Sequence, residues 1–176
     1  AGQDIFFPVI SYTPLLNTGL TTNRTTVSFA TITDNFTGVN TTAGTMPRLY
    51  FKKSTDANAF VGNTNADNGW KWVEANNSTS PFDFTFDYSI INGGTVAPGD
   101  VIQYYVVAQD LATTPNVSFS PSNGASGLSV APAGMTAPTA PNSYGIVSTI
   151  ASAVNVGTGY TYTTLTGSLA SGGLFA

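Results

Sequence analysis

Histidine and cysteine are absent from the 176-residue sequence, and charged residues make up only 8% of it. Without histidine and cysteine, the chain cannot contain a Ser-His-Asp or Cys-His nucleophile, nor a zinc, haem or iron–sulfur site with the usual ligands. Five Lys and Arg against nine Asp and Glu give a net charge of −4. Because cations are so few, the sequence offers no basic surface for nucleic acid or an anionic membrane. We therefore expect a protein that is not an enzyme and has no nucleic-acid partner.

The residues that are present favour β-structure. Hydrophobic residues make up 41% of the chain and include 11 Phe and 8 Tyr, which is enough for a buried core. The polar residues are mainly Thr, Asn, Ser and Gly, which suit strands and turns, whereas the helix formers Glu, Lys and Gln are scarce. No apolar run approaches the roughly 20 residues of a membrane span. We expect an all-β protein, secreted or at the cell surface, without membrane insertion.

Alternation of apolar and polar residues predicts about seven short strands. The clearest covers 82–88, where Phe82, Phe84, Phe86 and Tyr88 alternate with polar residues. The segment 101–109 is apolar on both faces, which is typical of a central strand. The segment 5–16 contains two prolines, which favours an edge position. The remaining predicted strands are 24–33, in which Ile32 joins the face of Val27 and Phe29 only through a bulge, and 47–53, 70–75 and 144–149.

The strand pattern predicts an immunoglobulin-like sandwich of two antiparallel sheets over residues 1–149. Within it, 111–141 is rich in Ser, Ala, Gly and Pro and has no period, so we interpret it as a long insertion or mobile loop. Residues 150–176 are predicted to be an extended Gly/Thr-rich tail or the start of a following module. We expect the chain to be a fragment of a longer protein.

A family resemblance is carried by four pieces of sequence: TITD (31–34), GV (38–39), PRLYFKK (47–53) and GDVIQYYVVAQD (99–110). Together they resemble the immunoglobulin-like, fibronectin-type-III-like modules of large secreted surface proteins from Bacteroidetes-type bacteria. Many of those proteins look like adhesins or filament components exported by the type IX system. The resemblance covers roughly residues 5–149 and implies a module that acts as an adhesin, spacer or filament subunit.

Two aspartates are candidate Ca²⁺ ligands. Asp34 ends the strand in the second position of the sandwich and Asp110 ends the strand in the sixth, and the loops that follow these strands emerge at the same end of such a fold. Together with Asn35 and backbone carbonyls, the two carboxylates could hold a Ca²⁺, which takes six to eight oxygen ligands. The alternative is that each carboxylate accepts backbone N–H hydrogen bonds in its own turn. No other cofactor is predicted.

Trp70 and Trp72 lie on one face of their predicted strand, about 6.6 Å apart along it. A flat aromatic pair of this kind can form a stacking platform for sugars, so a carbohydrate-binding module is the alternative function. The same spacing also describes two core side chains or a contact with a neighbouring subunit.

A hydrolase is not favoured, because the one close carboxylate pair on a strand face, Asp83 and Asp87, would lie about 13 Å apart. Glycosidases place their two carboxylates roughly 5–9.5 Å apart. The function predicted from the sequence is therefore that of a non-catalytic structural module. We expect its partners to be neighbouring modules or identical subunits, with surface glycans as the alternative. The segment 5–16 and the tail are expected to make these contacts, with the edge strands pairing by β-augmentation.

Overall fold

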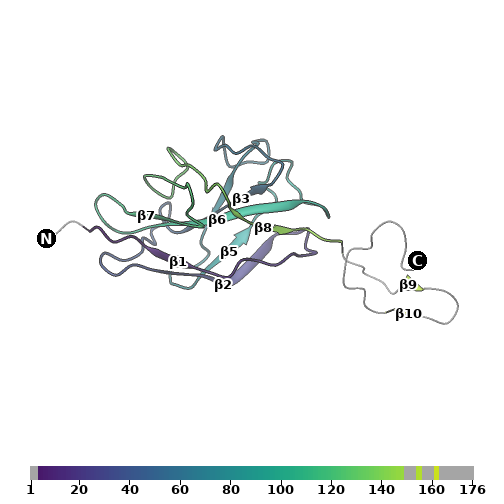
Figure 1. Cartoon of the computed structure of the whole chain (residues 1–176), viewed down its shortest axis with the longest axis horizontal. Helices are drawn as coiled ribbons and strands as arrows, with labels where there is room; N and C mark the ends of the chain where they lie inside the picture. The colour runs from purple at the N-terminus through teal and green to yellow at the C-terminus, as the bar shows by residue number, and fades with distance from the viewer. Residues whose placement is uncertain (1–3, 149–153, 156–160, 163–176) are drawn as a thin grey trace.

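The computed structural model describes residues 4–148, together with 154–155 and 161–162. All regular secondary structure in these residues is β, and two antiparallel sheets pack face to face (Figure 1). The predicted two-sheet sandwich is therefore confirmed. The described residues contain no helix that is long and apolar enough to cross a membrane.

The strand order follows an immunoglobulin-like plan. The smaller sheet has the order β1 (Val9–Ser11), β2 (Arg24–Thr33), β5 (Phe82–Phe86). The larger sheet has the order β4 (Lys71–Glu74), β3 (Arg48–Lys53), β6 (Val101–Gln109), and two short strands share the far edge of β6: β7 (Val117–Ser120) and β8 (Asn142–Gly145). In the predicted tail, β9 (Val154–Asn155) pairs with β10 (Thr161–Tyr162), and the rest of 150–176 lies outside the described residues.

Aromatic side chains fill the space between the sheets. The three phenylalanines of β5 are at most 1% exposed, as their alternation with polar residues predicts. Phe86 lies edge-to-face against Phe51, Tyr104 and Tyr144, with ring centroids 5.4–5.6 Å apart. Such contacts add to the hydrophobic free energy of burial.

The larger sheet is buried on both faces, which explains why β6 carries apolar side chains on both of its faces. On its outer face, Tyr105 stacks on Tyr50 with centroids 5.2 Å apart. The segment 121–141 covers these rings with three buried side chains, Val130, Met135 and Ala137. Part of the segment that we predicted to be a long insertion or mobile loop is thus the strand β7, and part of it packs on the sheet.

A bulge interrupts β2, but it contains Val27 and Phe29, whereas the sequence predicts a bulge that joins Ile32 to a face that they share. The register with β5 shifts between Thr26 and Ala30, and Ser28 within it has a φ of 49°. Val27 and Phe29 do not share a face as predicted: Val27 is 73% exposed, whereas Phe29 packs against the core that contains Ile32. The bulge lies between Thr26 and Ala30 and so changes the direction of the side chains within it.

Residues 4–18 run along both sheets. β1 lies at the edge of the smaller sheet, which confirms the edge position predicted for this segment. The chain then crosses to the larger sheet, where Thr18 pairs in parallel with Ile146. Between these points, the Tyr12 hydroxyl donates a hydrogen bond to the Ser120 carbonyl and accepts one from Asn142 Nδ2 at 2.9 Å. Tyr12 thereby joins the end of β7 to the beginning of β8.

Candidate functional site

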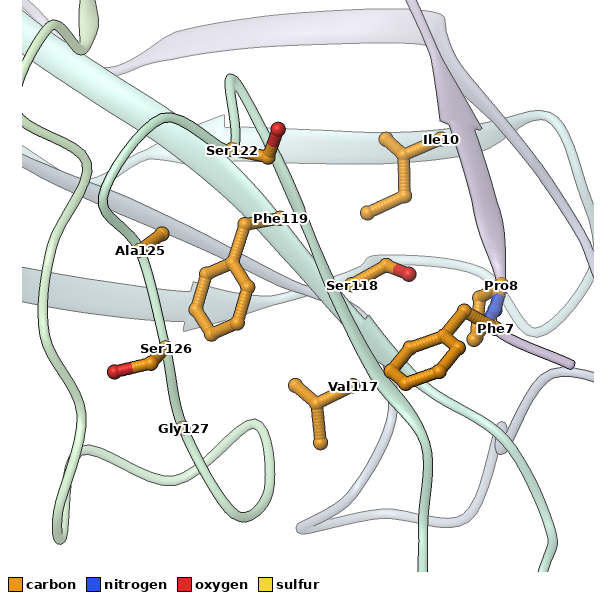
Figure 2. A pocket seen from close by; sticks show the side chains of 10 residues that line it. All are labelled: Phe7, Pro8, Ile10, Val117, Ser118, Phe119, Ser122, Ala125, Ser126 and Gly127. Atoms are coloured by element: carbon orange, nitrogen blue, oxygen red, sulfur yellow. The ribbon is translucent and has the colours of Figure 1, made fainter. Parts of the chain in front are cut away.

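An open groove of about 500 Å³ lies between β1 and β7. Figure 2 shows the N-terminal residues Phe7, Pro8 and Ile10 on one side of β7 and the segment 122–127 on the other. Val117 and Phe119 of β7 extend the apolar surface between them. None of the described residues that line the groove is charged, so its surface suits an uncharged, extended segment rather than an ionic ligand.

The segment that leads into the groove is unusually apolar for an exposed chain. Ile5, Phe6, Phe7 and Val9 are between 55% and 71% exposed. Consecutive exposed apolar side chains of this size mark interaction surfaces more often than scattered ones do.

Three aspartates meet at the end of the sandwich that carries the loops after β2 and β6. One carboxylate oxygen from each of Asp4, Asp34 and Asp110 lies within 4.8 Å of the other two. Asp110 is fully buried and Asp4 is 6% exposed. The structure thus brings together the two aspartates predicted from the sequence and adds a third, Asp4, which the sequence analysis missed.

The two predicted carboxylates also accept hydrogen bonds in their own turns, as the alternative interpretation predicted. Asp34 Oδ1 accepts from the N–H groups of Phe36 and Gly38, at 3.1 and 2.8 Å. Asp110 Oδ1 accepts from the N–H groups of Ala112 and Asn116, at 3.2 and 2.9 Å. The hydrogen bonds within the turns therefore do not prevent the three carboxylates from lying close together.

Asp4 ties the N-terminal segment to both loops. Its Oδ2 accepts a hydrogen bond from the Thr37 hydroxyl at 2.6 Å, which holds the pKa of the Asp4 carboxyl below its usual value. Its backbone carbonyl accepts from Asn116 Nδ2 at 3.2 Å, and the same amide donates to Asp110 Oδ2 at 2.6 Å. The arrangement brings together oxygen atoms from three separate segments that could serve as ligands for a cation.

Trp70 is a core side chain and offers no free face to a sugar. It is 1% exposed, its ring lies edge-to-face against Tyr105, and its Nε1–H donates to Asn58 Oδ1 at 2.6 Å. Trp72 is half-buried, with the Arg48 guanidinium 3.6 Å from its ring centroid. The sugar platform predicted from these two residues is therefore not exposed in this structure.

No protein-family model, curated protein or solved structure matches this chain. The strand order alone defines its class, an immunoglobulin-like β-sandwich.

Proposed function

We propose that this chain is a non-catalytic structural module that joins identical subunits or neighbouring modules through the open strand edges beside the groove. The proposal rests on a difference between the four sheet edges. At two of them the outward-facing backbone groups of the described residues are largely free, and at the other two they are hydrogen-bonded by asparagines. Among the described residues, β1 makes backbone hydrogen bonds only to β2, and β7 only to β6. Of the backbone groups of these two strands, only the Ser120 carbonyl at the end of β7 accepts a hydrogen bond from a described side chain, that of Tyr12. The two edges, open apart from this bond, flank the same groove.

The two opposite edges are closed by asparagines, through their side chains and one backbone N–H. On β4, the side chain of Asn63 accepts a hydrogen bond from the Trp72 N–H at 2.8 Å and donates one to the Trp72 carbonyl at 3.1 Å. On β5, Asn77 Oδ1 accepts from the Asp83 N–H at 2.8 Å, and the Asp83 carbonyl accepts from the Asn76 N–H at 2.9 Å. Proteins block edges in this way to prevent strand addition. The edges left open therefore favour β1 and β7 as the places where a further strand is added.

The composition supports a location outside the cell. A low-charge surface rich in Thr and Asn is typical of secreted material, and the resemblance to modules of bacterial surface proteins points the same way. A spacer, adhesin or filament subunit needs only such contacts and a stable core.

The test uses two valines of matched exposure. Val9 on β1 is 62% exposed and Val61, in the segment between β3 and β4, is 61% exposed. We expect the wild-type chain to associate with rising concentration in sedimentation velocity and to form ordered assemblies in negative-stain microscopy. Val9→Lys places a charge on the open edge and should weaken association at least tenfold, whereas Val61→Lys should leave it unchanged.

A chain that remains monomeric at every concentration would contradict assembly from identical subunits. Equal effects of the two valine substitutions would contradict the assignment of the contact to the β1 edge.

A further inference from the structure

We infer that Asp4, Asp34 and Asp110 bind one Ca²⁺, a property that goes beyond the proposed assembly role. The three carboxylates come from segments that are far apart in the sequence, yet their oxygens lie within 4.8 Å of one another. Two oxygens bound to one Ca²⁺ at 2.3–2.6 Å lie no more than about 5 Å apart. The spacing is therefore compatible with a shared ion.

No cationic side chain compensates these charges. All five Lys and Arg lie within the described residues, and their contacts are elsewhere. Arg48 and Lys53 pair with Glu74 and Asp100, at 3.3 and 3.4 Å. Arg24 lies over the Tyr144 ring, and the remaining two, Lys52 and Lys71, donate to backbone carbonyls. Like charges this close, two of them on buried residues, need a cation or a proton to offset their repulsion.

A buried oxygen in the cluster has no partner. Asp34 Oδ2 is a fully buried atom that accepts no hydrogen bond from the described residues, although Oδ1 of the same carboxylate accepts two. Among the described residues, the only other buried side-chain nitrogen or oxygen without a hydrogen-bond partner is Nε of Arg48. The guanidinium of Arg48 lies over the Trp72 ring. An orphaned carboxylate oxygen is costly in a folded protein unless something outside the chain satisfies it.

The donor set selects the class of ion. The sequence has no His or Cys, and carboxylate and carbonyl oxygens suit hard cations such as Ca²⁺ and Mg²⁺. Ligands from three loops, each already oriented by its own backbone hydrogen bonds, favour Ca²⁺, because Mg²⁺ demands near-ideal octahedral geometry. Bound there, Ca²⁺ would fasten Asp4 to the loops after β2 and β6. It would thereby fix the apolar residues 5–9 at the entrance to the groove.

The first test is isothermal titration calorimetry of the full chain, stripped of metal with a chelator and titrated with CaCl₂ at a concentration where it is monomeric. We expect one Ca²⁺ per chain. Asp34→Asn and Asp110→Asn should each weaken binding at least tenfold. Asp87→Asn makes the same change of charge at an aspartate outside the cluster and should leave binding unchanged.

Thermal unfolding provides a second test. The difference in Tm between the wild type and Asp34→Asn should have opposite signs with Ca²⁺ and in chelator. At a hundredfold excess over Kd, Ca²⁺ should raise the Tm of the wild-type chain by roughly 5–10 °C and leave that of Asp34→Asn unchanged. In chelator the order should reverse. The Asp34→Asn chain should then have the higher Tm, because it carries one charge fewer and its new amide can donate to a neighbouring carboxylate.

Three outcomes would overturn the inference: no calorimetric binding and no change of Tm in millimolar CaCl₂, an equal response of the wild type and Asp34→Asn, or a Tm that rises on acidification but not with Ca²⁺. The last outcome would mean that a proton, rather than Ca²⁺, offsets the repulsion between the three carboxylates. None of these results depends on assembly, so the Ca²⁺ site and the proposed function fail or succeed separately.

Discussion

Ser28 has a left-handed backbone conformation, with a φ of 49°, inside the bulge of β2, and its N–H donates to Asp83 Oδ1 at 2.6 Å. A side chain at such a φ costs about 1–2 kcal/mol, whereas glycine has no such penalty but loses more entropy on folding. Ser28→Gly should therefore raise the free energy of unfolding by about 0.5–1 kcal/mol. Urea denaturation of the two chains measures the difference, and a loss of stability in the glycine variant would contradict this account of the bulge.

At the same scale, the acidic cluster could be predicted only in part. The positions of Asp34 and Asp110 follow from strand order, because each residue comes directly after a strand whose place in the sandwich the sequence indicates. Asp4 precedes β1, and no local pattern says where that segment runs. Its position depends on Thr37 and Asn116, which lie far from it in the sequence.

At the scale of elements, the segment 121–141 is attached to the larger sheet through both backbone groups of Val130. The Val130 N–H donates to Gln109 Oε1 at 2.9 Å, and its carbonyl accepts from the Tyr50 hydroxyl at 2.6 Å. Tyr50→Phe leaves that buried carbonyl without a partner and should lower the free energy of unfolding by about 1–3 kcal/mol. Urea denaturation measures the loss, and limited proteolysis should show faster cleavage within 121–141.

Tyr105→Phe is the matched control. The Tyr105 ring stacks on Tyr50 and is equally buried, but its hydroxyl donates only to Met135 Sδ at 3.4 Å, and a thioether is a weak acceptor. This variant should lose less stability than Tyr50→Phe and retain the protection of the segment. Equal losses would mean that packing of the rings, rather than the bond to Val130, holds the segment in place.

The strands were more predictable than this segment for a physical reason. β5 and β6 have a regular apolar pattern because each residue meets a neighbouring layer at a fixed spacing. The segment 121–141 is anchored by single side chains at Val130, Met135 and Ala137, and such irregular spacing resembles that of an unattached loop. The short β7 is half-buried along its whole length and therefore has no alternation.

At the scale of the whole molecule, the burial of tyrosines limits the alkaline pH at which the folded state is stable. Burial raises the pKa of Tyr50 to about 12 and raises the pKa of five other tyrosines: Tyr12, Tyr88, Tyr104, Tyr105 and Tyr144. Below about pH 9 these groups are protonated in both states and stability does not depend on them. As the pH rises from about 9 through the ordinary tyrosine pKa of about 10, the unfolded chain loses protons that the folded chain retains, so the free energy of unfolding falls.

Tyr50 alone should account for a loss of about 2 kcal/mol by pH 12. We expect the midpoint of urea denaturation to be nearly unaffected by tyrosine ionisation up to about pH 9 and to fall increasingly steeply above it. The near-ultraviolet absorbance of tyrosinate should then rise together with unfolding. Tyrosinate that forms well before the fold is lost would contradict the assignment of these raised pKa values to burial.

The crossing of the N-terminal segment between the sheets has a consequence for mechanical load. The chain enters and leaves the sandwich at opposite ends of its long axis (Figure 1). Thr18 is hydrogen-bonded in parallel between Gly145 and Val147, through bonds of 3.0 and 2.8 Å. Tension between the two ends would pull these neighbouring segments in opposite directions along their own axes. The two bonds would then be loaded in shear and would break together rather than one after another, so this pairing would resist stretching cooperatively.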